Sequence, residues 1–210
     1  MTLVSQRRAA STDDNEVRQR LIDAASEVIA TGGVPAATSR AITDRAGENL
    51  ASITYYFGSK DALVSEALIR EARTLLQPVL DVLGGDDQPA TRLLTAVQML
   101  TRIVRERGDQ LTAYLDCLSR STQDDHVASE VRLLWRGLQR HLADDMVRQR
   151  DAGLIPAWVD PPAMAALIVA LANGVAAGAA VDPETTDPAA IGQQFASLLL
   201  AARTAAEPHP

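Results

Sequence analysis

Apolar residues recur at helical spacing along most of this chain. Between Glu16 and Thr31 they stand three or four residues apart, which predicts one amphipathic helix with an apolar face at Val17, Leu21, Ala24, Ala25 and Val28. Asp14 precedes this segment as a candidate N-cap, and Gly32 and Gly33 end it before Pro35. The first stretch of ordered chain is therefore predicted to be a single helix with clear ends.

Two very short helices are predicted next, over Ser39 to Ala46 and Leu50 to Tyr56. Thr38 and Asn49 precede them as N-caps, and Gly47 offers the left-handed exit between them. Three helices of which two are short, joined by a tight glycine turn, make a helix-turn-helix candidate. We expect Ile42, Ile53 and Phe57 to wedge the short helices against the first, which leaves an outward face at Leu50, Ala51, Ser52 and Thr54.

The remaining chain is also predicted to be helical. Ser59 caps a long helix from Lys60 to about Leu83, in which Pro78 should introduce a kink. Further helices are expected near residues 90–107, 109–120, 126–152, 161–181 and 188–205. The predicted fold is all-α, with about nine helices, divided into a flexible N-terminal arm (1–14), a helix-turn-helix domain (15–60) and a helical C-terminal domain (61–210).

The composition favours helices, and the net charge bears on whether the protein could bind DNA. Of 210 residues, 47% are hydrophobic but only 3% aromatic, a balance that disfavours sheets. The formal charge of -7 argues against a nucleic-acid partner until its distribution is considered. Residues 1–60 hold seven cations and seven acids, so the acidic excess lies entirely beyond residue 60.

A distinctive motif runs from Thr38 to Gly47 and continues from Ser52 to Leu63, where Tyr55-Tyr56-Phe57-Gly58-Ser59-Lys60-Asp61 is the most specific part. This motif closely resembles the N-terminal signature of the tetracycline-repressor family. The resemblance covers about residues 15–65. It implies a homodimeric DNA-binding transcriptional regulator, most often a repressor of a palindromic operator that a small-molecule effector releases. It also implies DNA contacts at Ser39, Arg40, Leu50, Ala51, Ser52, Thr54, Tyr56 and Lys60.

These residue types suit a DNA interface on physical grounds. Small side chains let a short helix enter the major groove, hydroxyls reach base edges or phosphates, and Leu50 offers contact with a thymine methyl group. Arg40 and Lys60 supply positive charge near phosphates. Tyr55 could equally complete a small core, and so could Tyr56, while Arg40 could be a solvated surface charge. Arg7 and Arg8 either reach the minor groove or merely aid solubility. Thr43, Glu48 and Leu50 depart from the family's usual residues.

By the same resemblance, the last two helices pack against their copies in a second subunit, and an effector binds between them and the DNA-reading part. Small and apolar residues support the dimer, with the predicted interface at Ala166, Ala170, Gly174, Ala177, Gly178, Leu198, Leu199 and Ala202. The alternative is that these helices are buried within one subunit. Large or polarisable side chains suggest a pocket at Met99, Tyr114, Cys117, Trp135, Trp158 and Met164, although each could be plain core.

Several other classes are weighed against this interpretation. The uncharged run from Met164 to Val181 is long enough to span a membrane, but its Ala and Gly content, Asn173 and its flanking acids argue against that. The single cysteine, Cys117, and the absence of a leader-like opening segment favour the cytoplasm. No cofactor or metal is expected, because His126 and His141 lack partners at ligand spacing. A small helical enzyme, a non-DNA-binding helical adaptor and an activator are the alternatives.

Overall fold

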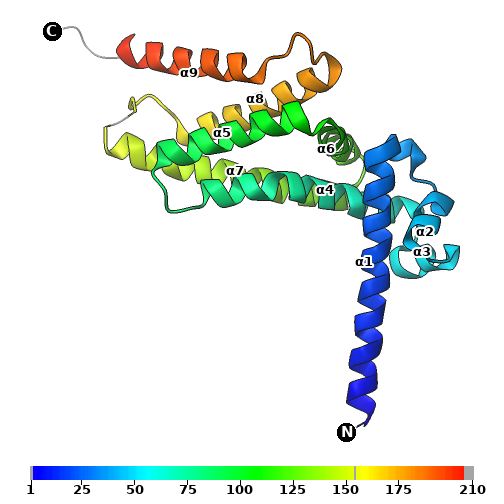
Figure 1. Ribbon diagram of the computed structural model, residues 1–210. Helices are drawn as coiled ribbons and strands as arrows, with labels where there is room; N and C mark the ends of the chain where they lie inside the picture. Colours follow the sequence, from blue (N-terminus) through cyan, green and yellow to red (C-terminus); the bar gives the residue numbers. More distant parts are fainter. Residues whose placement is uncertain (1, 154, 206–210) are drawn as a thin grey trace. The chain divides into compact units, whose positions relative to one another are not determined.

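The computed structural model is helical throughout the part of the chain that it describes. That part comprises the backbone of residues 2–153 and 155–205, with the side chains of residues 14–88, 91–92, 95–153, 155–195 and 197. No strand occurs within it (Figure 1). Its helices are α1 (Thr2–Ala36), α2 (Ser39–Ala46), α3 (Leu50–Phe57), α4 (Lys60–Leu83), α5 (Pro89–Glu106), α6 (Gly108–Arg120), α7 (Asp125–Asp151), α8 (Pro161–Val181) and α9 (Pro188–Ala205).

The predicted all-α fold is confirmed, and the main difference lies at the first helix. α1 begins at Thr2, so residues 2–14, which we expected to form a flexible arm, are helical, and Asp14 lies inside the helix instead of capping it. Gln6, Arg7, Arg8, Ala9 and Ala10 in this segment are good helix formers, which extend a helix at little cost once a nucleus exists. The predicted end holds, because Gly33 has a non-helical φ of 72° and ψ of 176°. Arg7 and Arg8 lie outside the described side chains.

The chain divides into two compact units that do not follow the predicted boundary at residue 60. The first unit comprises Met1–Arg73 and Thr112–Val131, and the second comprises Thr74–Leu111 and Arg132–Pro210. The first half of α4, most of α6 and the start of α7 therefore belong with the helix-turn-helix. Arg70 pairs with Asp23, and Arg73 with Glu130, within this first unit.

The core of the first unit is built around α1 and α4. Leu21, Ile42, Leu63 and Leu68 are all at most 1% exposed, so each of the first, second and fourth helices contributes a fully buried side chain. α2 packs against α1 and α3 follows it as a second short helix (Figure 1). The two short helices thus depend on longer neighbours for their position, as helices of eight residues must.

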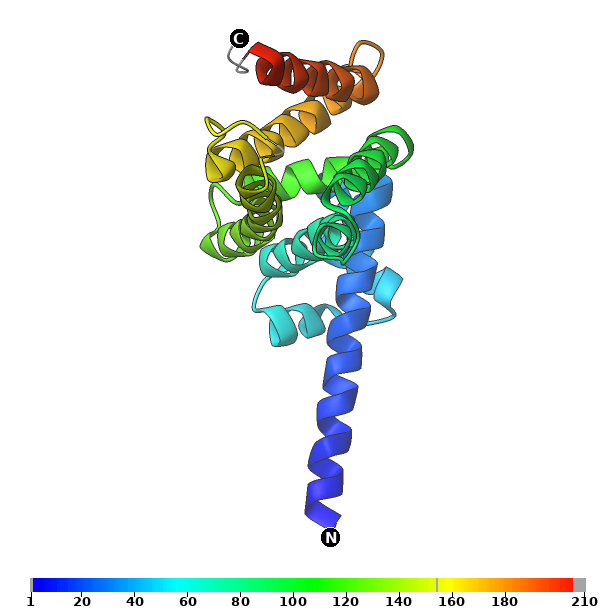
Figure 2. The same cartoon turned by 90° about the vertical axis from the view of Figure 1, so that its left-hand side faces the viewer.

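In the second unit, α5 packs against both α8 and α9, and α8 and α9 form a helical hairpin (Figure 2). Leu134, Leu138 and Leu142 bury the predicted face of α7. Arg92 on α5 pairs with Asp145 on α7, and both side chains are at least nine-tenths buried. Arg92 also donates a hydrogen bond to the Gly85 carbonyl, which ties the turn after α4 to the same cluster.

Candidate nucleic-acid interface

The two short helices are bounded by the capping residues that the sequence predicts. The Ala41 amide donates to Thr38 Oγ1 at 3.2 Å at the start of α2, and the Ser52 amide donates to Asn49 Oδ1 at 3.1 Å at the start of α3. Gly47 between them adopts the left-handed conformation, with φ 68° and ψ 30°. This turn therefore sets the angle between α2 and α3 through a backbone conformation that other residues adopt only at a cost.

Two of the three departures from the family pattern, Thr43 and Glu48, are accommodated by hydrogen bonds. Thr43 is 3% exposed, and its hydroxyl donates to the carbonyls of Ser39 and Arg40 at 2.9 and 3.2 Å, so it is buried without an unsatisfied polar group. Glu48 Oε1 accepts a hydrogen bond from Arg20 Nη2 at 2.6 Å. The acid at this position therefore joins α1 to the turn instead of disturbing it.

An exposed arc on α3 provides the surface that could meet a DNA groove. At 100° per residue, Leu50, Thr54, Ala51 and Tyr55 occupy adjacent positions over less than half of the helix circumference. Leu50 is 50% exposed and Tyr55 74%, and Ala51 and Thr54 are exposed as well. The other side of α3 carries Ile53, which is 3% exposed and packs into the core.

Ser52 is a correction to the predicted contact set. It is 9% exposed, and its hydroxyl donates to Asn49 Oδ1 at 3.3 Å, so it faces the protein and supports the cap. On the helix Ser52 lies 100° from both Ala51 and Ile53, at the edge of the exposed arc, so its contacts with Asn49 and the neighbouring helices decide its burial. Tyr55 takes the place of Ser52 on the exposed arc.

Tyr55 is one of the residues for which the sequence left the core and the DNA interface open. Its ring meets that of Tyr56 edge to face, with centroids 4.7 Å apart and planes at 88°. Tyr56 is half-buried and its hydroxyl lies 3.0 Å from Asp14 Oδ1 on α1. Tyr56 thus supports the more exposed ring of Tyr55. The spacing from Ala51 to Tyr55, four residues on one helix, is the signal that would have placed Tyr55 on the reading side.

Arg40 differs from the other described cations of the helix-turn-helix segment, residues 14–60. Arg18 pairs with Glu66 at 3.2 Å, Arg45 with Glu27 at 2.6 Å and Lys60 with the adjacent Asp61 at 3.1 Å, whereas exposed Arg40 has no ion pair among the described residues. The Lys60 pair is exposed and contributes little, so a phosphate could replace Asp61. Ser39 is half-buried at the start of α2, beside Arg40.

α8 carries an exposed stripe of small and apolar residues. Ala166, Ala170, Gly174 and Ala177 are exposed, and Gly174 has open space around it. Leu167 is 50% exposed and Val181 86%, which extends the stripe. Gly178 is a correction, because it faces Thr186 in the turn before α9, where a Cβ atom would lie 3.2 Å from Oγ1. Leu198, Leu199 and Ala202 lie outside the described side chains.

By length and composition alone, α8 could also cross a membrane. Only 22% of its most apolar window is buried within the chain. The residues that are buried, such as Ala165 and Val169, lie on the opposite side from the exposed stripe. α8 is apolar on all sides, but only one side is covered by its own chain. This pattern is expected of a helix whose other side packs against another surface.

The predicted effector residues are distributed over both units. Tyr114 and Cys117 are buried in the first unit, where burial raises the pKa of the Cys117 thiol to about 11. Met99, Trp135 and Met164 are half-buried in the second unit. Trp158 is 54% exposed in the connection between α7 and α8, so its side chain does not line an enclosed cavity.

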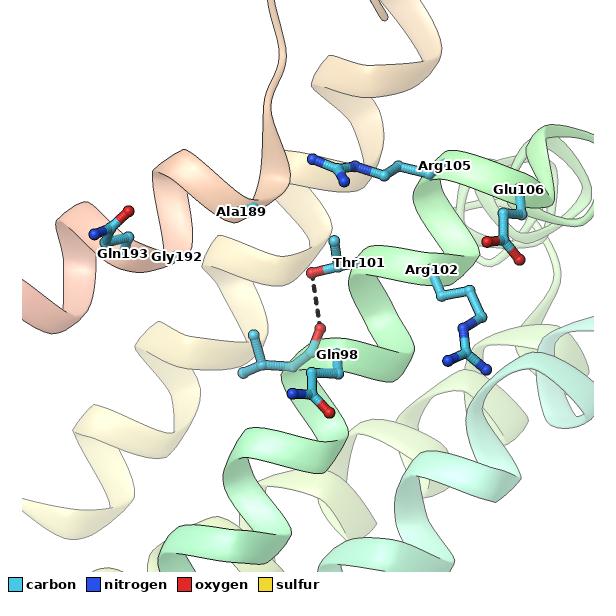
Figure 3. A pocket seen from close by; sticks show the side chains of 9 residues that line it. Gln98, Thr101, Arg102, Arg105, Glu106, Ala189, Gly192 and Gln193 are labelled. Atoms are coloured by element: carbon cyan, nitrogen blue, oxygen red, sulfur yellow. Dashed lines mark hydrogen bonds between the residues drawn. The ribbon is translucent and has the colours of Figure 1, made fainter.

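A shallow pocket of about 360 Å³ lies between α5 and α9, and none of the six predicted residues lines it. Arg105 reaches toward α9, where Nη2 lies 3.1 Å from Asp187 Oδ1, whereas Arg102 and Glu106 point away from that helix (Figure 3). The pocket is open and charged. It does not resemble the apolar enclosed sites that usually hold small organic ligands. Among the described residues, no three His, Cys, Asp or Glu side chains are grouped as metal ligands would be.

A capped helix-turn-helix with an exposed reading arc, followed by a helical domain, defines the class of helical DNA-binding regulators. The model of bacterial regulatory proteins of the tetR family matches residues 21–67, and the model of BetI-type transcriptional repressor C-terminal domains matches residues 89–203. The second match covers more than half of the chain. This chain belongs to the tetR family of bacterial transcriptional regulators, which are DNA-binding transcription factors and not enzymes.

Solved structures show the same fold at low sequence identity. A TetR transcription regulator from Haloarcula marismortui is 19% identical, with a TM-score of 0.75 over 89% of this chain and 98% of the other. A putative regulator from Saccharomonospora viridis in complex with choline is also 19% identical, with a TM-score of 0.73 over 87% and 95%. SmeT, the repressor of a Stenotrophomonas maltophilia multidrug efflux pump, is 22% identical, with a TM-score of 0.66 over 88% and 89%. No curated protein matches the chain.

Proposed function

We propose that this protein is a homodimeric transcriptional repressor that binds a palindromic operator and leaves it when a small-molecule effector binds. The observation that carries the proposal is the exposed arc of α3 beside Arg40, the described cation of the helix-turn-helix segment that no acid neutralises. The match of the C-terminal residues 89–203 to BetI-type repressors supports the repressing role. A cytoplasmic location follows from the need to reach chromosomal DNA.

The DNA contacts we propose are Arg40, Leu50, Ala51, Thr54, Tyr55 and Lys60, with Ser39 and Tyr56 at the margin. Arg40 and Lys60 would bind phosphates and so fix the register of the protein on the duplex. The arc of α3 would read base edges in the major groove, where Thr54 offers a hydroxyl and Leu50 an apolar contact with a thymine methyl group. Ser52 supports α3 from the protein side.

The exposed stripe on α8 supports a dimer through this helix. Exposed Ala and Gly residues allow two helix backbones to approach closely, and covering exposed Leu167 and Val181 would remove apolar surface from water. A two-fold axis at this interface would present two copies of α3 to one duplex. Half-sites one helical turn apart, roughly 34 to 36 Å, give a palindromic operator.

Effector release would be a shift between two conformers that differ in DNA affinity. Pro78 inside α4 is a site at which this helix could change its course, and it lies next to the end of the first compact unit at Arg73. Choline is a rational first ligand to test because a structural neighbour was solved in complex with it. A quaternary ammonium prefers aromatic faces. Tyr114 or Trp135 is therefore a better candidate contact than the arginine-lined pocket between α5 and α9.

The proposal is tested by selecting bound fragments from a random duplex library with the full-length protein. We expect a palindrome with half-sites about one turn apart and an affinity that falls steeply with salt. A helical adaptor would select no duplex even at low salt, and an activator would raise a reporter placed behind the selected site. Ala170→Glu places a charge in the proposed interface, so it should give monomers in sedimentation, whereas Ala30→Glu, at an exposed position of α1, should not.

A further inference from the structure

One guanidinium group joins three helices of the helix-turn-helix unit. Arg18 lies on α1, and its Cζ atom is 5.1 Å from the ring centroid of Phe57, the last residue of α3. Its Nη2 atom is 3.2 Å from Glu66 Oε2 on α4. The charge therefore contacts an aromatic face on one side and a carboxylate on another, which is a combination that only a planar cation makes well.

The carboxylate that holds Arg18 is itself shared with α7. Glu66 Oε1 lies 3.1 Å from His126 Nε2, so its two oxygens contact two helices far apart in sequence. The preceding residue, Ser65, is 2% exposed and donates to Asp124 Oδ2 at 2.9 Å. The residues Arg120, Asp124 and His126 form what we call the α6–α7 corner, and it contacts α4 at two successive positions.

The α6–α7 corner is a fixed electrostatic arrangement. Arg120 Nε donates to Ser65 Oγ at 2.7 Å and Nη2 to the Asp61 carbonyl at 3.1 Å. Burial alone would raise the pKa of the Asp124 carboxyl, but hydrogen bonds from Ser65 and from the Val127 and His126 amides, with the Arg120 charge, lower it below its usual value. Asp124 is thus held ionised where it both caps α7 and fixes Ser65.

The position of α3 depends on such contacts because the helix has only eight residues. Its exposed arc cannot be held from the outside, and its C-terminal end is defined by Phe57 and Gly58, where the Gly58 amide caps the Thr54 carbonyl at 3.0 Å. Phe57 is half-buried, so Arg18 covers a ring that the core does not fully enclose. A shift of this ring would tilt Thr54 and Tyr55, one turn and two residues away.

We propose that Arg18 is a positioning residue for DNA reading: held by Glu66, it fixes Phe57 and hence the angle of α3, and the α6–α7 corner controls it through α4. The inference rests on the proposed role of α3 and deepens it. Arg18 then acts on affinity without contacting a phosphate. It also follows that residues of α6 and α7, outside the helix-turn-helix, influence operator affinity.

The test compares Arg18→Met with Arg70→Met in the full-length protein. Both arginines join α1 and α4 through an ion pair of similar exposure, but among the described residues Arg70 pairs with Asp23 on α1, and its ion pair and hydrogen bond do not involve α3. The probe is the tightest 30-base-pair duplex selected with the wild-type protein. We expect Arg18→Met to weaken its binding by about fivefold to tenfold, and Arg70→Met to leave it unchanged at a similar loss in melting temperature.

The salt dependence separates positioning from direct contact. Loss of a phosphate contact lowers the slope of log affinity against log salt by about one, whereas loss of a positioning residue leaves that slope unchanged. We therefore expect the wild-type slope in Arg18→Met. We also expect the duplex affinity of Arg18→Lys, which keeps the charge without the planar face, to lie between those of the wild-type protein and Arg18→Met. A slope reduced by about one would show Arg18 to be a phosphate contact and overturn the proposal.

The α6–α7 corner is tested with Glu66→Gln and Asp124→Asn. Both keep the side-chain shape and lose a charge, and Asn still caps a helix well. We expect each to weaken duplex binding, and each to weaken it less when Arg18 is already Met, because contacts in one network do not add. If the wild-type protein binds tightly, either of two results would overturn this proposal and leave the proposed function standing. One is that the losses from these variants add fully to that of Arg18→Met, and the other is that Arg18→Met binds the duplex as tightly as the wild type. If the wild-type protein selects no duplex, the proposed function fails and this inference with it.

Discussion

The buried ion pair in the second unit predicts a large and specific loss of stability. Arg92 and Asp145 are 8% and 6% exposed, and a second arginine, Arg148, contacts the same carboxylate from a more exposed position. Asp145→Ala would leave the Arg92 guanidinium buried with the Gly85 carbonyl as its remaining described partner, and its Nε already lacks one. Removing one partner of a buried pair costs about 3 to 5 kcal/mol.

Urea unfolding at fixed protomer concentration measures this loss. With a slope of about 2 kcal/mol per M, the midpoint should fall by roughly 1.5 to 2.5 M. Asp144→Ala is the matched control: its side chain is exposed with no hydrogen bond or ion pair among the described residues, so its effect should stay within about 0.5 kcal/mol.

A double variant separates charge burial from packing. Arg92→Met with Asp145→Leu removes both charges and keeps apolar volume, so it should recover most of the loss, since apolar replacements of buried pairs are often neutral or better. A loss below about 1 kcal/mol in Asp145→Ala would refute the reasoning, because Arg92 would then reach water without its partner.

Three further predictions concern the helix-turn-helix unit. Arg40→Ala should weaken duplex binding by roughly 1 to 3 kcal/mol and lower the salt slope by about one, whereas Arg45→Ala, on the same helix but paired with Glu27, should do neither in a titration of labelled duplex. Gly47→Ala should cost about 1 to 2 kcal/mol in thermal unfolding, since the φ of 68° is strained for alanine although a Cβ meets nothing within 4 Å; Gly47→Asn should cost less. Burial raises the pKa of the Cys117 thiol from 9.0 to about 11. The contribution of the protonated thiol to the free energy of unfolding is therefore complete below pH 9 and is lost as the pH rises through about 11. A thiol reagent at pH 8 should label the unfolded chain rapidly and the folded chain slowly, and rapid labelling of both would contradict the burial.

The sequence by itself determined the elements of this protein. Thr38, Asn49 and Ser59 predict the starts of α2, α3 and α4, and Gly47 predicts the end of α2, as the structure has them, because capping depends on residues next to the helix end. The apolar spacing likewise predicted the buried sides of α4 and α7. The tyrosine-rich motif up to Lys60 and Asp61 was specific enough to indicate the family.

The tertiary structure decided which sides of these helices are free. Ser52 turned inward and Tyr55 outward, and Gly178 met Thr186 instead of an open surface, because neighbouring helices determine burial at the edges of an apolar stripe. The pairing of Arg18, Arg45 and Lys60 with acids likewise left Arg40 exposed without one among the described residues. Charge balance along a sequence cannot show this, since an ion pair requires two groups within about 4 Å in space, whatever their separation along the chain.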